Sequence, residues 1–266
     1  MRRRSLQGFF AASGIGVLGG LVGLGGAEFR LPVLKGWFRL ASLQAVVFNK
    51  GISLVVVCFA LLFRSYEITP SLLLSHIDIT LNLLAGSLVG AWIAAGRAMR
   101  ISEALLDRII MVLLLALALL LLSHTFWSPE NSGRAFENPW LQYGAGIVAG
   151  FGIGVVAALL GVAGGELLIP TIVLLYGVDA KLAGSLSLLV SLPTMIVGFW
   201  RYSQGEVFAV FRTERGLLRG MVTGSIVGVA LGSLLLGSVS TDALLVFLAL
   251  LLVLSAYKTF SHSKEK

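Results

Sequence analysis

The chain has 266 residues, of which 57% are hydrophobic and only 12% are charged. A soluble domain of this length carries about 25% charged residues because its surface faces water. The composition therefore excludes a cytosolic enzyme, a secreted domain and a disordered protein, and it predicts a chain solvated largely by lipid. The excess of 20 basic over 13 acidic residues indicates loop orientation rather than nucleic-acid binding, since basic residues concentrate in cytoplasmic loops.

Apolar segments long enough to cross a bilayer, about 20 residues each, alternate with short ones in a repeated order. In the first half they lie at 9–26, 31–38 (short), 41–63, 71–95 and 104–123. In the second half they lie at 141–162, 167–176 (short), 182–200, 216–236 and 243–260. The polar stretch His124–Pro139 predicts an exposed linker. We therefore expect a first transmembrane repeat at 1–124, a linker at 125–139 and a second repeat at 140–266.

The first segment follows three arginines, Arg2 to Arg4, which is also the pattern of a cleaved signal peptide. Its Gly-rich sequence, however, has a close counterpart in the middle of the chain. That counterpart favours a retained membrane helix.

An internal duplication relates the two halves through a shift of 138 residues, the difference between positions 28 and 166. Low-complexity apolar sequence produces chance matches of Leu and Val, but it seldom repeats Gly, Glu and Pro in one register. The matched positions are Gly14 to Val17 with Gly152 to Val155, Gly26, Glu28 and Pro32 with Gly164, Glu166 and Pro170, Ser53 with Ser191, and Gly86, Ser87 and Gly90 with Gly224, Ser225 and Gly228. The pattern predicts two homologous halves.

The short segments at 31–38 and 167–176 are too brief to cross a bilayer at 1.5 Å per residue. If each forms a broken, re-entrant unit with the segment before it, each half adds three full crossings and the second half is inverted. Fifteen basic residues then fall on the cytoplasmic side and three, Arg64, Arg134 and Lys181, fall outside. With ordinary crossings instead, Arg97, Arg100 and Arg108 fall outside. We therefore expect an all-α polytopic membrane protein with inverted-topology repeats, about eight membrane segments and both termini in the cytoplasm.

Each half carries a break element, running from Gly23 to Pro32 and from Gly161 to Pro170. Gly permits unusual backbone angles and Pro removes an amide donor, so both elements predict a helix that stops and restarts. Matching breaks in two halves of a membrane protein are typical of a substrate site at the bilayer midplane. The helix that follows each break directs its amides and positive dipole end at the break, which suits an anion.

The alternative for such glycines is close helix packing. This alternative suits the glycines outside the two break elements: Gly14, Gly16, Gly86, Gly90, Gly152, Gly154, Gly224 and Gly228.

Four ionisable residues lie inside apolar segments: Glu28, Arg30, Lys50 and Glu166. Each costs roughly 2.5–3.5 kcal/mol near the bilayer centre on insertion scales. The charges cancel if all four are ionised, whereas one protonated Glu leaves a net positive charge that an anion neutralises. Glu28 and Glu166 are therefore candidates for proton coupling. Snorkelling or pairing with Glu28 is the alternative for Lys50, and we expect Arg30 at the cytoplasmic interface rather than on a ligand.

Uncharged polar residues on the next helices supply hydroxyl and amide groups for an oxyanion. Asn49 and Ser53 share one helix face, as do Ser187 and Ser191. Serines in membrane helices also bond to their own backbone, which is the alternative for them. His76 and Asp78 lie toward the end of their segment, where an interfacial location explains them better than a proton relay.

Motifs for enzymatic chemistry are absent from the sequence. It has no phosphate-cradling motif, no metal-ligand cluster and no nucleophile–base arrangement, and its one cysteine, Cys58, permits no internal disulfide. We therefore expect neither an enzyme nor a resident cofactor or metal.

The two break elements, with the later Gly-Ser-x-x-Gly patches, resemble those of the TauE/SafE-type sulfite exporter family, from about Gly14 to Leu254. The resemblance implies a permease of the bacterial inner membrane for small anions, such as sulfite or organosulfonates. The family's Gly-rich element falls on Gly23, Gly25, Gly26, Glu28 and Pro32, and its second copy on Gly161, Gly164, Gly165, Glu166 and Pro170. The chain departs from it at Ala27 and Ala163, and Arg30 is an unusual charge beside the first copy.

These features together predict a secondary transporter that moves a small anion by alternating access, coupled to H⁺ or Na⁺. The alternative is an uncoupled anion channel with the same central site. Partners are the anion and the lipid bilayer, without nucleic acid; a homodimer is compatible with the sequence. The substrate-binding candidates are Gly25, Gly26, Glu28, Pro32, Asn49, Lys50, Ser53, Gly164, Gly165, Glu166, Pro170, Ser187 and Ser191.

Overall fold

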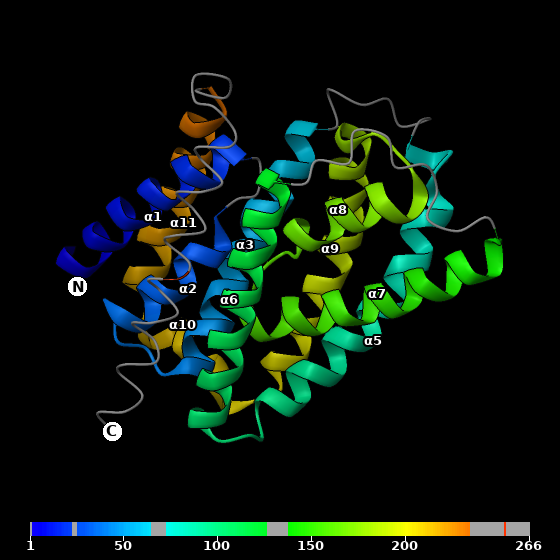
Figure 1. Cartoon of the computed structure of the whole chain (residues 1–266). Coiled ribbons are helices and arrows are strands. Elements are labelled where there is room, and N and C mark those ends of the chain that lie inside the picture. Colours follow the sequence, from blue (N-terminus) through cyan, green and yellow to red (C-terminus); the bar gives the residue numbers. More distant parts are fainter. Residues whose placement is uncertain (1, 23–25, 65–72, 127–137, 235–252, 254–266) are drawn as a thin grey trace.

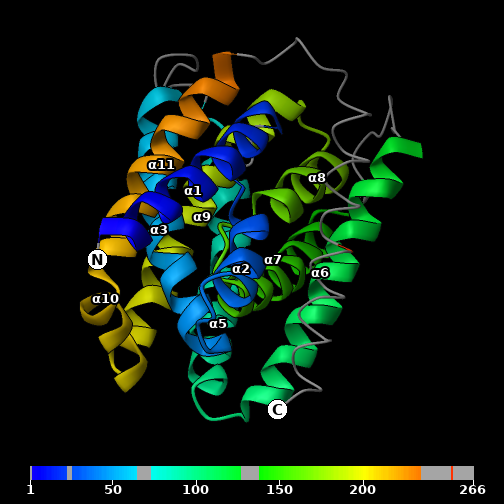
Figure 2. The same ribbon diagram turned by 90° about the vertical axis from the view of Figure 1, so that its left-hand side faces the viewer.

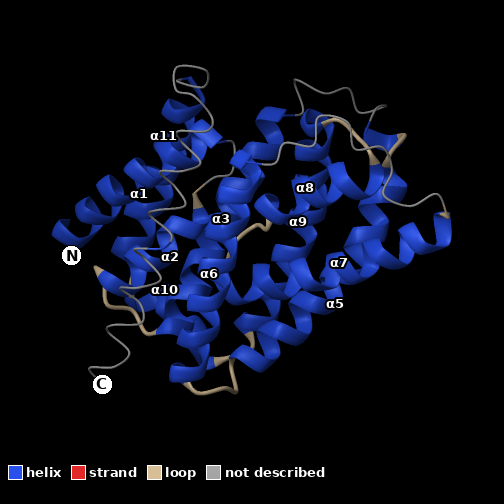
Figure 3. Ribbon diagram, viewed as in Figure 1, coloured by secondary structure: helices blue, strands red, loops and turns tan. Residues whose placement is uncertain are grey.

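The computed structural model describes residues 2–22, 26–64, 73–126, 138–234 and 253, and every element in these ranges is a helix (Figure 3). The first half contains α1 (Arg2–Val22), α2 (Ala27–Gly36), α3 (Ser42–Arg64), α5 (Ile77–Ala98) and α6 (Glu103–Phe126). The second contains α7 (Pro139–Leu160), α8 (Gly165–Tyr176), α9 (Ala180–Ser203), η1 (Glu206–Ala209), α10 (Val210–Thr213) and α11 (Arg215–Leu234). Gly25, most of the linker and nearly all of the last apolar segment lie outside the described residues.

The expected class of an all-α polytopic membrane protein is confirmed. Four helical stretches in the described ranges are long and apolar enough to cross a membrane: Ser42–Phe59, Ile77–Ala98, Pro139–Leu160 and Leu182–Ser203. The short helix Gly165–Tyr176 is apolar but below that length. Long helices therefore coexist with a short one, as the lengths of the apolar segments predict.

Two pairs of helices pack side by side, α1 with α11 and α5 with α7 (Figures 1 and 2). Each pair joins a helix of one half to a helix of the other. A Cβ atom built on Gly86 would lie 2.0 Å from the Ile147 carbonyl oxygen, and one on Gly224 would lie 2.3 Å from that of Phe9. The two partners, Phe9 and Ile147, are themselves related by the shift of 138 residues. The same backbone contact therefore recurs in both pairs.

The second glycine of each patch behaves in the same way. A Cβ on Gly90 would lie 2.2 Å from the Phe151 carbonyl oxygen, and a Cβ on Gly228 would lie 2.2 Å from that of Ser13. Real Cβ atoms do not approach backbone oxygens so closely, so any larger residue forces the helices apart. Close packing is confirmed as the role of these patches.

The four remaining glycines divide into two kinds. An added Cβ on Gly16 or Gly154 would lie within 3.0 Å of the Ser225 or Ser87 carbonyl oxygen, which fits close packing. Gly14 and Gly152 are exposed, and no described atom lies within 4 Å of a Cβ added there. Among the described residues, Gly14 and Gly152 therefore make no such packing contact, because they face away from the helix that their neighbours contact.

Each short helix ends beside the beginning of the long helix that precedes it. Arg4 Nη2 donates a hydrogen bond of 2.9 Å to the Phe38 carbonyl oxygen, just after α2. In the second half Gln142 Nε2 donates one of 2.8 Å to the Leu175 carbonyl oxygen, near the end of α8. The α1–α2 unit and the α7–α8 unit thus each return to the end of the molecule from which they start.

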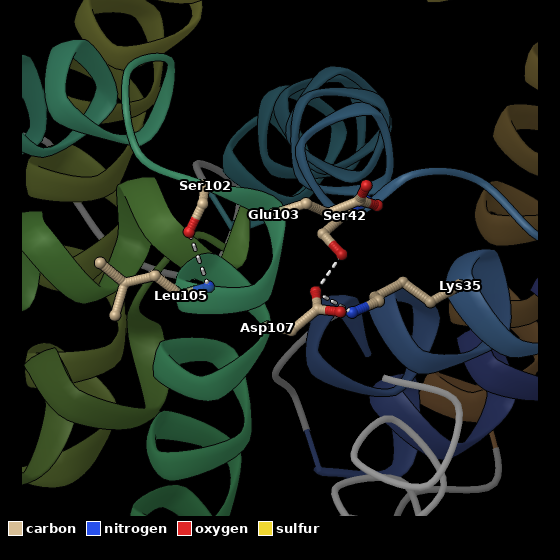
Figure 4. A network of polar contacts seen from close by, with 6 residues as sticks. All are labelled: Lys35, Ser42, Ser102, Glu103, Leu105 and Asp107. Atoms are coloured by element: carbon tan, nitrogen blue, oxygen red, sulfur yellow. Dashed lines mark hydrogen bonds and ion pairs between the residues drawn. The ribbon is translucent and has the colours of Figure 1, made fainter. Parts of the chain in front are cut away.

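A polar network joins the end of α2 to the beginnings of α3 and α6 (Figure 4). Lys35 forms an ion pair with Asp107, and Ser42 Oγ donates a hydrogen bond to the same carboxylate. The Ser42 backbone amide donates to Glu103 Oε1 at 3.1 Å. Val173 occupies the position of Lys35 in the second half, so this ion pair has no counterpart there.

The short helix α2 is held in the core by its apolar face. Leu31 and Leu34 are completely buried, together with Val46, Phe48 and Ile52 of α3. Fully burying a Leu or Ile side chain contributes about 1.5–3 kcal/mol. This packing fixes α2 against α3 and thereby positions the polar residues of its first turn.

Candidate functional site

The helices are interrupted between α1 and α2 and again between α7 and α8, at the two break elements that the sequence predicts. Gly26 precedes α2 with φ of 68°, while Gly161 and Gly164 in the second break have φ of 68° and 81°. These left-handed angles favour glycine. A Cβ on Gly26 would also lie 2.6 Å from the Ile15 carbonyl oxygen, and one on Gly161 would lie 2.3 Å from that of Val46. The predicted interruption of both helices is confirmed.

Glu28 and Glu166 lie in the first turn of α2 and of α8, with only 2% and 8% of their surfaces exposed. Their carboxyl groups lie close enough to interact with each other. Two ionised carboxylates close together in a buried site repel each other, which favours one shared proton on the pair. The sequence places both acids at breaks, and the structure brings the two breaks together.

Each carboxyl group belongs to the first turn of its own helix, where the backbone amides have no partner within the helix. The positive ends of α2 and α8 therefore face side-chain carboxyls of the protein itself. The sequence predicts amides that suit an anion, and Glu28 and Glu166 lie in the same first turns of α2 and α8. An incoming anion would have to displace or share these carboxyl groups.

Pro32 and Pro170 each occupy the sixth position of their helix and are half-buried. A proline has no N–H to donate to the carbonyl four residues earlier. The two carbonyls concerned belong to Glu28 and Glu166. Each proline therefore leaves the carbonyl oxygen of the acidic residue without the usual hydrogen bond within the helix. Both prolines lie inside their helices rather than at the breaks.

Asn49 on α3 connects the two breaks. It is completely buried, and its Nδ2 donates to the Ala27 carbonyl oxygen at 2.9 Å and to the Leu160 carbonyl oxygen at 3.1 Å. Its Oδ1 is buried without a hydrogen-bond partner among the described residues. Asn49 therefore holds the beginning of α2 against the end of α7, as a structural link that leaves one acceptor unused.

Lys50 is also completely buried, and its Nζ donates to the Ala157 carbonyl oxygen at 3.1 Å. Tyr202 Oη donates to the Ala158 carbonyl oxygen at 3.1 Å. A cation at a helix C-terminus is favoured by the helix dipole, so these side chains stabilise the end of α7. Within the described ranges Lys50 forms no ion pair with an acid, and its burial is incompatible with snorkelling. Neither pairing with Glu28 nor snorkelling is therefore correct for Lys50.

Arg30 is completely buried and donates through Nη1 to Ser53 Oγ at 3.3 Å. Glu28 interacts with its charge. The expectation of an interfacial Arg30 is wrong, because the residue belongs to the first turn of α2, beside the break, rather than to the outer end of that helix. In the sequence, the position of Arg30 two residues after Glu28 indicates that it lies beside the break.

The equivalent serines of the second half differ from those of the first. Leu168 occupies the position of Arg30, and Ser191 Oγ, which corresponds to that of Ser53, is buried without a described hydrogen-bond partner. Ser187 Oγ donates to the Gly184 carbonyl oxygen of its own helix at 2.8 Å. The backbone-bonding alternative is confirmed for Ser187.

Of the remaining candidates, Gly164 and Gly165 lie at the second break, whereas His76 and Asp78 lie away from both breaks. Gly164 is buried directly before α8, and Gly165 is half-buried with room for a Cβ among the described atoms. His76 and Asp78 lie at the beginning of α5, where Asp78 is exposed.

Sequence reasoning missed Tyr202, and it also missed the hydrogen bond of 2.7 Å between Ser87 and Thr194, because neither contact follows from spacing along one helix.

Comparison with known proteins identifies the family. The family profile of the sulfite exporter TauE/SafE matches residues 8–259 of the 266 in the chain. No curated protein and no solved structure matches the chain. The proteins of this family are membrane transporters rather than enzymes, which agrees with the long apolar helices of the fold. The chain belongs to the sulfite exporter TauE/SafE family of membrane transporters.

Proposed function

We propose that this protein is a secondary transporter that moves a small anion across the bacterial inner membrane by alternating access. Its substrate class is a sulfur oxyanion or an organosulfonate, such as sulfite, which is what membership of the family suggests. The observation that carries the proposal is that two buried carboxyl groups, Glu28 and Glu166, one from each helix break, lie close enough to interact. Two breaks that meet in the interior of a membrane protein are typical of a transport site.

The second half is inverted relative to the first in this proposal. Arg4 lies beside Phe38 at the end of the α1–α2 unit, and Lys35 of that unit contacts Asp107 near the beginning of α6. The end of α5, which directly precedes α6, therefore belongs to the same end of the molecule as the beginning of α1.

Helices α5 and α7 run in the same direction, since Gly86 faces Ile147 and Gly90 faces Phe151. The beginning of α7 is therefore placed at the opposite end from that of α1. This arrangement supports inverted repeats, each with a broken unit and three full crossings. Together with the distribution of basic residues, it favours both termini in the cytoplasm.

Proton coupling follows from the charges buried at the breaks. Glu28 and Glu166 offset Arg30 and Lys50 when all four are ionised, and one proton on the carboxyl pair leaves a single positive charge. Uncompensated charge is costly in a site of low dielectric. A monovalent anion therefore binds best together with one proton. The coupling ion in this proposal is H⁺ rather than Na⁺.

Counterflow in proteoliposomes tests the transporter function. Vesicles loaded with unlabelled sulfite should accumulate labelled sulfite transiently, and the initial rate should saturate with substrate concentration. A channel would instead give a current that follows the membrane potential, without transient accumulation. The second result would replace alternating access with an uncoupled anion pore.

A further inference from the structure

The helices α5 and α9 carry a pair of tryptophan rings close to their carboxyl-terminal ends. Both helices contain a stretch long enough to cross a membrane, and these stretches end at Ala98 and at Ser203. Trp92 of α5 contacts Trp200 of α9, with ring centroids 5.5 Å apart. The two ends therefore lie side by side and reach the same membrane–water interface.

The guanidinium group of Arg201, on α9, lies against α5 beside this aromatic pair. Its Cζ atom is 5.0 Å from the centre of the Trp92 ring. A Cβ atom on Gly96 would lie 3.1 Å from its Nε, so the missing side chain at position 96 leaves room for the guanidinium. A cation over the face of a Trp ring is attracted by the ring electrons. The position of the Arg201 charge is therefore fixed by groups from both helices.

Arg201 has no acidic partner among the described residues. Its Nη1 donates a hydrogen bond of 2.5 Å to the neutral Gln204 Oε1, and its Nε is buried without an acceptor in the described ranges. Neither of the ion pairs in those ranges includes it. Glu206, the acid nearest to it in the sequence, is exposed in η1. The protein therefore supplies no counter-charge for this guanidinium, and an anion at the interface can do so.

Exposed residues extend this corner along both helices. Arg100 is exposed in the turn that directly follows α5 and adds a second cation at the interface. Toward the middle of the helices, Val89 of α5 and Ile196 of α9 are 52% and 49% exposed. They lie one helical turn before Trp92 and Trp200 and share their faces. Cations at the interface thus continue into an apolar strip that faces lipid.

We propose that this corner binds an anionic phospholipid, whose phosphate contacts Arg201 and Arg100 and whose acyl chain lies along Val89 and Ile196. Tryptophan at the membrane–water interface and basic groups between membrane helices are typical of headgroup binding. Two cations without an acidic partner favour a lipid with net negative charge over a zwitterionic one. The inference goes beyond the transport site and requires only that the protein lies in a membrane.

Native mass spectrometry of the purified full chain, released from detergent, tests the proposal. The anionic probe is dioleoylphosphatidylglycerol, and the zwitterionic probe with the same acyl chains is dioleoylphosphatidylcholine. We expect the anionic lipid to bind about tenfold or more tightly, because guanidinium groups form charge-assisted hydrogen bonds with phosphate. Glycerophosphoglycerol has the same headgroup without acyl chains, and it should not displace the anionic lipid at equal concentration.

Three variants separate this site from general charge attraction. Arg201→Gln should weaken phosphatidylglycerol binding about tenfold and leave phosphatidylcholine binding unchanged. Arg100→Gln should weaken phosphatidylglycerol binding several-fold. The matched control is Arg219→Gln, which removes the same charge from an exposed arginine of α11. This control should bind both lipids as the wild type does.

The result that overturns the proposal is an unchanged affinity of Arg201→Gln for phosphatidylglycerol. Should that variant not fold, an unchanged affinity in Arg100→Gln has the same meaning, since Arg100 is exposed. An equal loss in Arg219→Gln would indicate attraction by net charge and would also overturn the proposal. Equal binding of the two lipids, or full displacement by glycerophosphoglycerol, would exclude an anionic lipid as the occupant.

Discussion

The buried carboxyl groups of Glu28 and Glu166 lie close enough to interact although the two residues are 138 positions apart. The duplication places the same residue type in the first turn of α2 and of α8, and the fold brings these turns together. Two adjacent ionised carboxylates in a buried site repel each other strongly. Sharing one proton removes this repulsion, and the proton thereby becomes part of the site.

Replacing either acid should remove proton-driven transport without unfolding the protein. Glu28→Gln and Glu166→Gln each keep the side-chain shape but cannot gain or release the proton, so we expect proton-driven sulfite uptake to be abolished. Expression and membrane insertion should stay near wild type. The measurement is uptake by proteoliposomes in an imposed pH gradient.

The matched control for these variants is Glu206→Gln, because Glu206 is exposed in η1. It should transport at the wild-type rate. An equal loss of folded protein in Glu28→Gln and Glu166→Gln would indicate a structural role for the acids instead.

The glycine patches should not tolerate a methyl group. Gly90→Ala and Gly228→Ala place a Cβ about 2.2 Å from a backbone oxygen, so the helices must separate. We expect the free energy of unfolding to fall by about 1–3 kcal/mol in each variant. Thermal or chemical unfolding of purified protein in detergent measures this change.

Gly152→Ala is the control, since Gly152 is helical and no described atom lies near an added Cβ. Its stability should stay the same or rise by up to about 1 kcal/mol, because alanine favours helix more than glycine does. Equal destabilisation in all three variants would contradict the packing role of the patches.

Asn49 should matter for stability through its two hydrogen bonds. Asn49→Leu keeps a similar volume but leaves the Ala27 and Leu160 carbonyl oxygens without their side-chain donor. We expect the free energy of unfolding to fall by about 1–3 kcal/mol. Gln44→Leu on the same helix removes an exposed amide and should change stability little. Similar effects in the two variants would show that Asn49 does not link the breaks energetically.

The ion pair of Lys35 and Asp107 should couple more strongly than an exposed pair. Their side chains are 11% and 14% exposed, whereas those of Arg4 and Glu214 are 47% and 17% exposed. Double-mutant cycles with Lys35→Met and Asp107→Asn should give a coupling energy of about 0.5–3 kcal/mol in unfolding experiments. The cycle with Arg4→Met and Glu214→Gln should give about 0.2–1 kcal/mol. A smaller coupling for Lys35 and Asp107 would contradict the arrangement in Figure 4.

Composition was sufficient for the membrane class, and the repeated Gly, Glu and Pro elements were sufficient for the positions of both breaks and, through their resemblance to a known family, for the family. Apolar segment length determines whether a helix spans lipid, and the left-handed angles at Gly26 and Gly164 require glycine locally. The Gly86 and Gly90 patch was also identified from spacing, because small residues four apart share one helix face.

The contacts between the halves could not be predicted in the same way. The proximity of Glu28 and Glu166 depends on how two distant turns meet, and the burial of Arg30 depends on which end of α2 lies inside. Lys50 has an apolar surrounding that the sequence shows, but its partner, the Ala157 carbonyl oxygen, is a backbone group that no side-chain pattern reveals.

Simultaneous recording of proton and anion flux in proteoliposomes tests most directly whether the paired acids couple the two movements. We expect sulfite entry to bring protons with it in wild-type protein, at a rate that does not depend on membrane potential, and we expect no such proton movement in Glu28→Gln or Glu166→Gln. Sulfite flux that follows the membrane potential and carries no protons in the wild type would contradict this mechanism and would indicate a channel.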